Sequence, residues 1–148
     1  MKLRTQDPWM TGVDYSRGLH GFTVNLLVAD IGRAVEFARR VLGATVVFSD
    51  PDFAAVRYGE QEWMLHADHT YDRHPHGSRT LEASFRGAGV ELRIHDADVD
   101  AAVRAAGALG CTVLSEPQQK GHGMREAYIL DLDGYTWVVD AFVGPPAG

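Results

Sequence analysis

An internal duplication constrains the fold of this chain more than any other feature. Residues 21–43 and 89–110 follow one pattern: apolar residues alternate with polar ones, an aspartate follows, and apolar residues then recur at helical spacing. The alternation predicts a strand with one buried face, and the later spacing predicts an amphipathic helix. Asp30 and Asp98 stand at matching places, where a short polar side chain caps a helix N-terminus. We therefore interpret the chain as two copies of one unit.

The duplication continues beyond the helices, because three further strand patterns follow in each copy. Trp63 near the end of the first copy matches Trp137 near the end of the second. The expected strands are 21–28, 44–49, 53–58 and 62–67, then 89–95, 111–115, 125–130 and 135–142, with helices at 31–42 and 99–109. The expected organisation is an N-terminal arm (1–20), one domain (21–142) of two βαβββ modules (about 21–67 and 89–142) joined by an irregular loop (68–88), and a tail (143–148).

Composition excludes several functions. The 148 residues carry a formal net charge of −6, which argues against nucleic acid or an anionic membrane as the main partner. No apolar run approaches the roughly 18–20 residues that cross a bilayer, and the N-terminal residues lack a secretory signal. Cys111 is the only cysteine, so no intrachain disulfide and no cysteine-based zinc site is expected. We expect a cytoplasmic protein.

Three motifs of the second copy carry a family resemblance: GVELRIHDADVDAA from Gly89, LGCTVLSEPQ from Leu109 and HGMREAYILDLDGY from His122. Their order and spacing resemble the glyoxalase, bleomycin-resistance and dioxygenase superfamily, also called vicinal oxygen chelate proteins, and its bleomycin-resistance-like branch in particular. The resemblance covers residues 21–142. It implies an α+β fold in which two βαβββ modules form an open cup of mixed β-sheet with helices packed outside, usually completed by dimerisation.

The resemblance also implies where a metal would lie. Enzymes of this superfamily hold one divalent metal with His, Glu or Gln from the first and last strands of each module. The corresponding positions here are Thr23, Met64, Glu91 and Val138. Only Glu91 is a plausible ligand, because methionine sulfur is soft and valine has no donor atom. We therefore expect no metal at the usual place.

Histidines keep a different metal site open as an alternative. Four of the seven histidines lie between His66 and His76, but the segment after His66 holds Pro and Gly and shows no register that would fix ligand geometry. An exposed polar loop is the favoured interpretation of that segment. A displaced site deeper in the cup, built from His66, His95 and Asp140, remains the competing one.

Strand parity identifies the side chains that would face the cup. If the apolar residues of each strand face the helices, the alternate residues face the interior. Such a mixed lining suits an organic ligand with several hydrogen-bonding groups. The expected ligand-binding residues are Thr23, Asn25, Met64, His66, Glu91, Arg93, His95, Val138 and Asp140. The charged residues among them have a competing interpretation, in which they merely satisfy one another as a buried network.

The expected function is therefore metal-free binding of a small organic molecule, with antibiotic sequestration as one form of it. The alternative is a lyase, isomerase or dioxygenase of the same superfamily with a displaced divalent metal, in which Glu91 would be the catalytic base. We expect a homodimer, because open sheet edges need cover and twofold pairs are the commonest oligomers. Trp9 is expected to anchor the arm to the body of the protein or to a second subunit.

Overall fold

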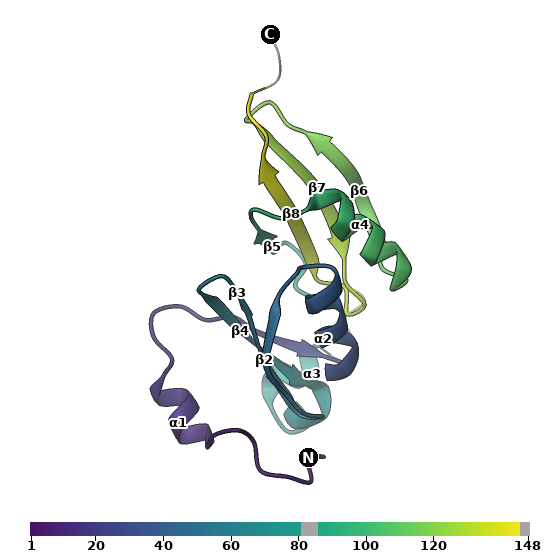
Figure 1. Ribbon diagram of the computed structural model, residues 1–148. Coiled ribbons are helices and arrows are strands. Elements are labelled where there is room, and N and C mark those ends of the chain that lie inside the picture. Colours follow the sequence, from purple (N-terminus) through teal and green to yellow (C-terminus); the bar gives the residue numbers. More distant parts are fainter. Residues whose placement is uncertain (81–85, 146–148) are drawn as a thin grey trace. The chain divides into compact units, whose positions relative to one another are not determined.

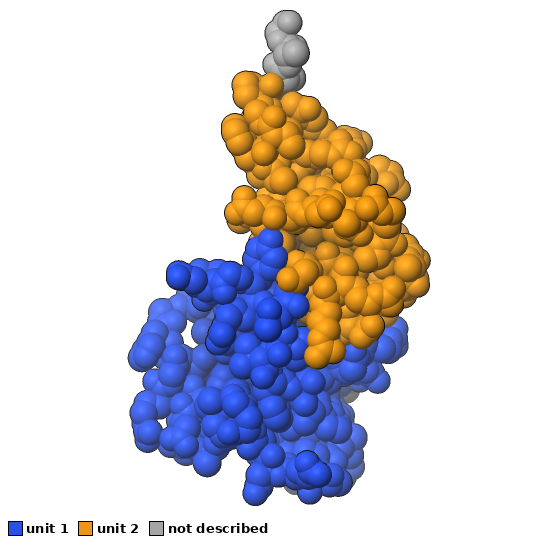
Figure 2. Space-filling model, viewed as in Figure 1, with its two compact units in different colours: residues 1–35, 44–82 blue, residues 36–43, 83–148 orange. Residues whose placement is uncertain are grey.

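The structure, a computed structural model, describes residues 1–80 and 86–145. The chain divides into two compact units (Figure 2). The first unit holds residues 1–35 and 44–82, and the second unit holds residues 36–43 and 83–148. Each unit is built on one four-stranded sheet.

The first sheet contains β1 (Asn25–Val28), β2 (Thr45–Ser49), β3 (Phe53–Tyr58) and β4 (Gln61–Ala67) in the order β1-β4-β3-β2. Strand β1 runs parallel to β4, and the other pairs are antiparallel. Helix α2 (Ile31–Arg40) follows β1. Asp30 precedes this helix, and its carboxylate accepts a hydrogen bond from the Arg33 amide at 2.8 Å.

The second sheet repeats this arrangement with β5 (Glu91–Ile94), β6 (Thr112–Gln119), β7 (Met124–Leu130) and β8 (Thr136–Phe142) in the order β5-β8-β7-β6. Helix α4 (Val99–Ala108) packs against β6, β7 and β8 (Figure 1). Asp98 caps this helix by accepting from the Ala101 amide, as predicted. The predicted fold class is confirmed: α+β, with two βαβββ modules that each form an open, mixed four-stranded sheet.

Apolar side chains with strand and helix periodicity form the buried core. Ala54, Val56, Ile129 and Val139 are fully buried on the inner strands β3, β7 and β8. Trp63 and Trp137, which occupy matching positions in the two copies, are also buried. No helix in the described ranges is both long enough and apolar enough to cross a membrane.

The prediction of an irregular loop over residues 68–88 was wrong in part, because two short helices lie there. They are η1 (Asp68–Tyr71) and α3 (Pro75–Thr80). Proline fits the first position of a helix, where its missing N–H is not needed. The Thr80 hydroxyl closes the last turn by donating to the His76 carbonyl. Residues 81–85 of the predicted loop lie outside the described residues.

Two further boundaries differ from the prediction. Strand β6 continues to Gln119, beyond the expected strand at 111–115. The strand accommodates Pro117 because it lies at the edge of its sheet and its register shifts between Ser115 and Gln118. The N-terminal arm, for which no helix or strand was predicted, contains a short helix, α1 (Gly12–Arg17), capped by the Thr11 hydroxyl. The final three residues of the predicted tail lie outside the described residues.

Candidate binding site

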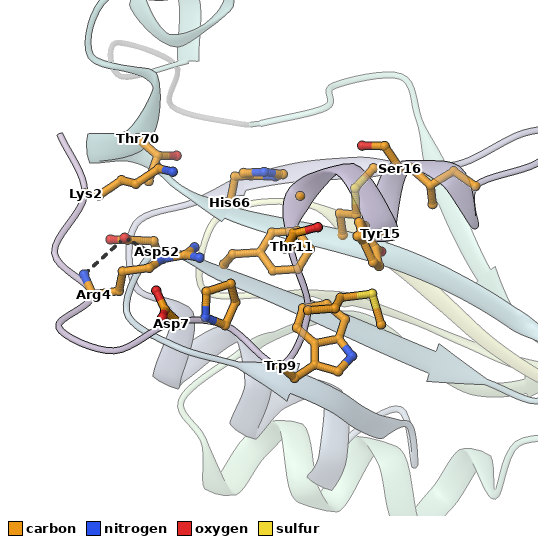
Figure 3. Close-up of a pocket in the computed structure, with 16 residues that line it drawn as sticks. Lys2, Arg4, Asp7, Trp9, Thr11, Tyr15, Ser16, Asp52, His66 and Thr70 are labelled. Atoms are coloured by element: carbon orange, nitrogen blue, oxygen red, sulfur yellow. Dashed lines mark hydrogen bonds and ion pairs between the residues drawn. The ribbon is translucent and has the colours of Figure 1, made fainter.

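A cavity of about 780 Å³ lies in the first unit, between the N-terminal arm and one face of the first sheet (Figure 3). Trp9 and Tyr15 line it from the arm, and Phe53, Met64 and His66 line it from β3 and β4. Strand register places these three residues on one face, since Phe53 pairs with His66 and Met64 is two residues away on β4. Of the predicted ligand-binding residues, Met64 and His66 line this cavity.

Aromatic rings hold the arm against the sheet. The indole of Trp9 stacks on the ring of Phe48, with centroids 4.3 Å apart. Tyr15 meets the rings of Trp9 and Phe53 edge-on, at 5.4 and 5.5 Å. Trp9 therefore anchors the arm to the body of the protein, the first of its two expected roles. The sequence did not predict that the arm forms a wall of the cavity. The only signal for this role was the presence of two large aromatic residues, Trp9 and Tyr15, in a segment without periodicity.

Asp52 ties the beginning of the arm to the sheet. Its carboxylate is only 1% exposed. It accepts hydrogen bonds from the Leu3 amide at 2.7 Å, the Arg4 amide at 3.1 Å and the Arg4 side chain at 3.2 Å. His69 Nε2 adds a further contact at 2.8 Å. Burial alone would raise the pKa of Asp52, but these hydrogen bonds outweigh it and hold the pKa well below its usual range. Asp52 is therefore the ionised anchor of the arm.

His66 is held in one orientation by its neighbours. Its Nδ1 lies 2.5 Å from Asn25 Oδ1, and Asn25 Nδ2 donates to the Tyr71 hydroxyl at 3.0 Å. The ring of Phe53 packs edge-to-face on the imidazole, with centroids 4.9 Å apart. Burial, together with the positive charge of Arg4, lowers the pKa of His66 below its ordinary value of 6.5. The imidazole is therefore neutral at pH 7.

A smaller cavity of about 270 Å³ lies beside the first and shares Tyr15, Leu19 and Met64 with it. Thr23, another predicted ligand-binding residue, lines this second cavity. The carboxylate of Glu62 accepts from the Tyr15 hydroxyl at 3.1 Å and from Arg57 at 2.9 Å. Burial, and then the charge and hydrogen bond of Glu62, raise the pKa of Tyr15 to about 12. Tyr15 therefore remains a neutral wall residue of both cavities.

The remaining predicted residues belong to the second unit, where Arg93 gathers three carboxylates. Its guanidinium donates to Glu91 at 2.9 Å, Glu126 at 2.8 Å and Asp140 at 3.1 Å. Glu126 and Asp140 are 5% and 1% exposed. His95 Nδ1 lies 2.6 Å from the second oxygen of Asp140. Burial opposes the charge of Arg93, but the hydrogen bonds that it donates to its partners outweigh burial and raise its pKa.

The structure thus brings Glu91, Arg93, His95 and Asp140 together in one hydrogen-bonded network, as the competing interpretation of these residues expected. Glu126 is a further member, which was not among the residues predicted from sequence. Arg125 pairs with Asp100 at 2.7 Å. Val138, the ninth predicted residue, is fully buried on β8 opposite Arg93. A ligand-binding role for these residues stays a prediction.

The described side chains do not supply the ligand set of a divalent metal. Within residues 1–80 and 86–145, no group of three or more His, Cys, Asp or Glu side chains is placed to hold one. His66 contacts Asn25, His69 contacts Asp52, and His74 Nδ1 accepts from the amide of His76. The four positions implied by the resemblance, Thr23, Met64, Glu91 and Val138, supply a single carboxylate. No step of a mechanism is therefore assigned to a metal.

Comparisons with known proteins agree with the fold. The model of the Glyoxalase/Bleomycin resistance protein/Dioxygenase superfamily matches residues 21–139, and no curated protein matches the chain. A glyoxalase/bleomycin resistance protein/dioxygenase family enzyme from Burkholderia phytofirmans PsJN is 22% identical with a TM-score of 0.67, covering 81% of this chain and 96% of that chain. A glyoxalase-related enzyme from Fulvimarina pelagi is 15% identical, with a TM-score of 0.64 and coverage of 82% and 87%.

A third solved structure, a glyoxalase/bleomycin resistance protein/dioxygenase from Nocardioides, is 21% identical with a TM-score of 0.59, covering 92% of this chain and 95% of that chain. At these identities the likeness concerns the fold. The family model begins at residue 21, so the arm that covers the cavity lies outside the matched residues.

Proposed function

Because this chain belongs to the glyoxalase/bleomycin resistance protein/dioxygenase superfamily, we propose that it binds a small organic molecule without a metal, as a member of the bleomycin-resistance-like branch. The cavity under the arm is the observation that carries this proposal. Sequestration of an aromatic antibiotic is the form of binding that we propose for it. A cytoplasmic location, expected from the composition, goes with this proposal.

The cavity has the size and lining of a site for an organic ligand. Its volume of about 780 Å³ falls within the range of roughly 300–1,000 Å³ that is usual for small-molecule sites. Trp9, Tyr15 and Phe53 supply apolar surface, and His66 supplies a polar contact in the same space. Figure 3 shows Lys2, Arg4 and Asp52 gathered at one end of the cavity and Trp9 and Tyr15 at the other. An amphipathic aromatic molecule matches such a lining.

The alternative, an enzyme of the same superfamily, has one observation in its favour. His66 is neutral and lies in the cavity wall, as a catalytic base would. Glu91, the base expected from the sequence, instead forms an ion pair with Arg93. Binding without turnover remains our first proposal, for two reasons. The donor atoms at the metal positions do not fit a metal, and among the described residues no hydroxyl or thiol is hydrogen-bonded to His66.

We also propose that two chains form a homodimer. Strands β1 and β2 are the outer strands of the first sheet, and β5 and β6 are those of the second. Unpaired strand edges favour association with another chain. Leu114 on β6 is 53% exposed, which adds apolar surface at one of these edges. Light scattering would report twice the chain mass of 16.2 kDa. A monomer of that mass at every concentration would contradict the dimer and leave the cavity proposal standing, since the cavity is lined by one chain.

Calorimetric titration tests the binding proposal. The purified protein, with and without prior chelator treatment, is titrated with glycopeptide, peptide and planar aromatic antibiotics. We expect at least one aromatic compound to bind with the same affinity in both preparations. The Trp9→Ala variant is expected to bind it at least tenfold more weakly, whereas Val13→Ala, an exposed change on the same arm, should bind normally. Failure of every class, or about one equivalent of Fe, Mn, Ni or Zn that is lost in His66→Gln, would overturn the proposal.

A further inference from the structure

His66 presents one defined polar atom to the cavity, because its hydrogen bonds fix the tautomer. Asn25 Nδ2 donates to the Tyr71 hydroxyl, which turns the amide oxygen of Asn25 towards His66 Nδ1. A carbonyl oxygen only accepts, so Nδ1 must carry the proton of the neutral imidazole. The other ring nitrogen, Nε2, is then an acceptor. Among the described residues, none donates a hydrogen bond to it.

The surroundings of the imidazole keep it neutral and rigid. Phe53 and Tyr71 pack edge-to-face on it, with ring centroids 4.9 and 5.5 Å away. The positive charge of Arg4 and the burial of the ring both lower the pKa of His66. Protonation would therefore be opposed by an apolar environment and a neighbouring cation. The ring offers a lone pair at pH 7.

Three hydroxyl groups of the cavity wall have already used their donors. The hydroxyl of Thr11 donates to Asp14, that of Tyr15 to Glu62, and that of Thr70 to the Ala67 carbonyl. Asp52 at the charged end accepts on both of its oxygens. At these positions a ligand that brings its own hydrogen-bond donor is therefore better matched than one that brings only acceptors, whereas Lys2 and Arg4 add cationic donors at the charged end of the cavity.

We propose that the cavity selects aromatic molecules that carry an N–H or O–H donor, such as phenols, indoles or similar heterocycles, and that His66 Nε2 accepts the hydrogen bond from this donor. The proposal rests on the proposed binding function and names its ligand class. The aromatic walls would supply most of the affinity, and His66 would discriminate between ligands of similar shape.

Two probes of similar shape separate these contributions. The compound 2-naphthol carries an O–H donor, and 2-methoxynaphthalene has the same rings without it. We expect wild-type protein to bind 2-naphthol about tenfold more tightly, which is the usual effect of one well-placed hydrogen bond. In His66→Phe the two affinities should become equal while both probes still bind. The same change at an exposed histidine of the second unit, His122→Phe, should preserve the tenfold ratio.

Nuclear magnetic resonance supplies a measurement that needs no variant. The nitrogen-15 resonance of His66 Nε2 should move on addition of 2-naphthol and stay in place with the ether, because only the first donates a hydrogen bond to it. Equal affinities for the two probes in the wild type, with no shift of Nε2, would overturn the selectivity and leave the binding function intact. Failure of both probes and of naphthalene itself to bind would overturn the ligand class and count against the binding function as well.

Discussion

The two sheets share one strand order, yet at equivalent positions one sheet carries a neutral polar pair and the other carries a charged pair. In the first unit, Asn25 on β1 contacts His66 on β4. In the second unit, the equivalent residues are Arg93 on β5 and Asp140 on β8, and they form an ion pair. The first pair is neutral and the second is charged. The same backbone arrangement therefore supports two different electrostatic environments.

The neighbouring strand accounts for this difference. Phe53 lies opposite His66 on β3, whereas Glu126 lies opposite Asp140 on β7. An aromatic ring beside His66 disfavours its charged form, and two buried carboxylates require a cation between them. The first sheet thus keeps a neutral acceptor beside apolar surface, which suits a ligand, while the second sheet directs Glu126 and Asp140 towards Arg93. The two copies therefore share one fold, and the different residues at these few positions give the two sheets different electrostatic environments.

Removal of the cation should have the largest effect. Arg93→Met leaves Glu126 and Asp140 buried without their shared partner. We expect the free energy of unfolding to fall by about 3–5 kcal/mol, the usual cost of breaking a buried pair from one side. Chemical denaturation followed by circular dichroism measures this change. Restoring the charge with Arg93→Lys should recover part of the loss, since the ammonium can reach fewer oxygens at once.

The equivalent substitution in the first unit sharpens the comparison. Asn25→Leu removes hydrogen bonds to a neutral imidazole and to the Tyr71 hydroxyl, and it leaves no buried charge without a partner. We expect a smaller loss of about 1–2 kcal/mol. Equal losses for Arg93→Met and Asn25→Leu would contradict the distinction between a charged and a neutral sheet.

The attachment of the arm should give an intermediate effect. Asp52→Ala removes the acceptor for the Leu3 and Arg4 amides and for the Arg4 side chain. We expect the arm to detach, with a loss of about 1–3 kcal/mol and much faster hydrogen exchange at those two amides. The matched control is Asp7→Ala, an exposed change on the arm. Unchanged exchange at Leu3 and Arg4 in Asp52→Ala would show that the aromatic contacts alone hold the arm.

The fold was predictable from sequence because its signals are local and repeated. Asp30 and Asp98 each begin a helix as their positions indicated, and strand parity placed Met64 and His66 on the face that lines the cavity. The role of the arm was not predictable, since its attachment depends on Asp52 and Phe48, which are distant in sequence. Extending the parity argument to residues 125–130 would have placed Glu126 beside Asp140.

The smallest expected effect is a pH dependence of the free energy of unfolding. It should come from the neutral His66, which contacts Asn25, and not from Asp52, the anchor of the arm. The pKa of His66 in the folded state lies below its ordinary value of 6.5, so near and just below that pH the unfolded chain binds more protons than the folded chain. The contribution of the neutral His66 to stability is therefore fully present above pH 6.5 and is lost as the pH falls below that value. Asp52 has a lowered pKa, so its contribution to stability persists above its ordinary pKa of 3.8 and is lost only under stronger acid.

The measurement is the free energy of unfolding of wild type and His66→Gln from pH 8 to pH 5. The two proteins should converge as pH falls, because the variant lacks the group that takes up the proton. Parallel curves would show that His66 titrates alike in both states and would remove the electrostatic part of the comparison between the sheets.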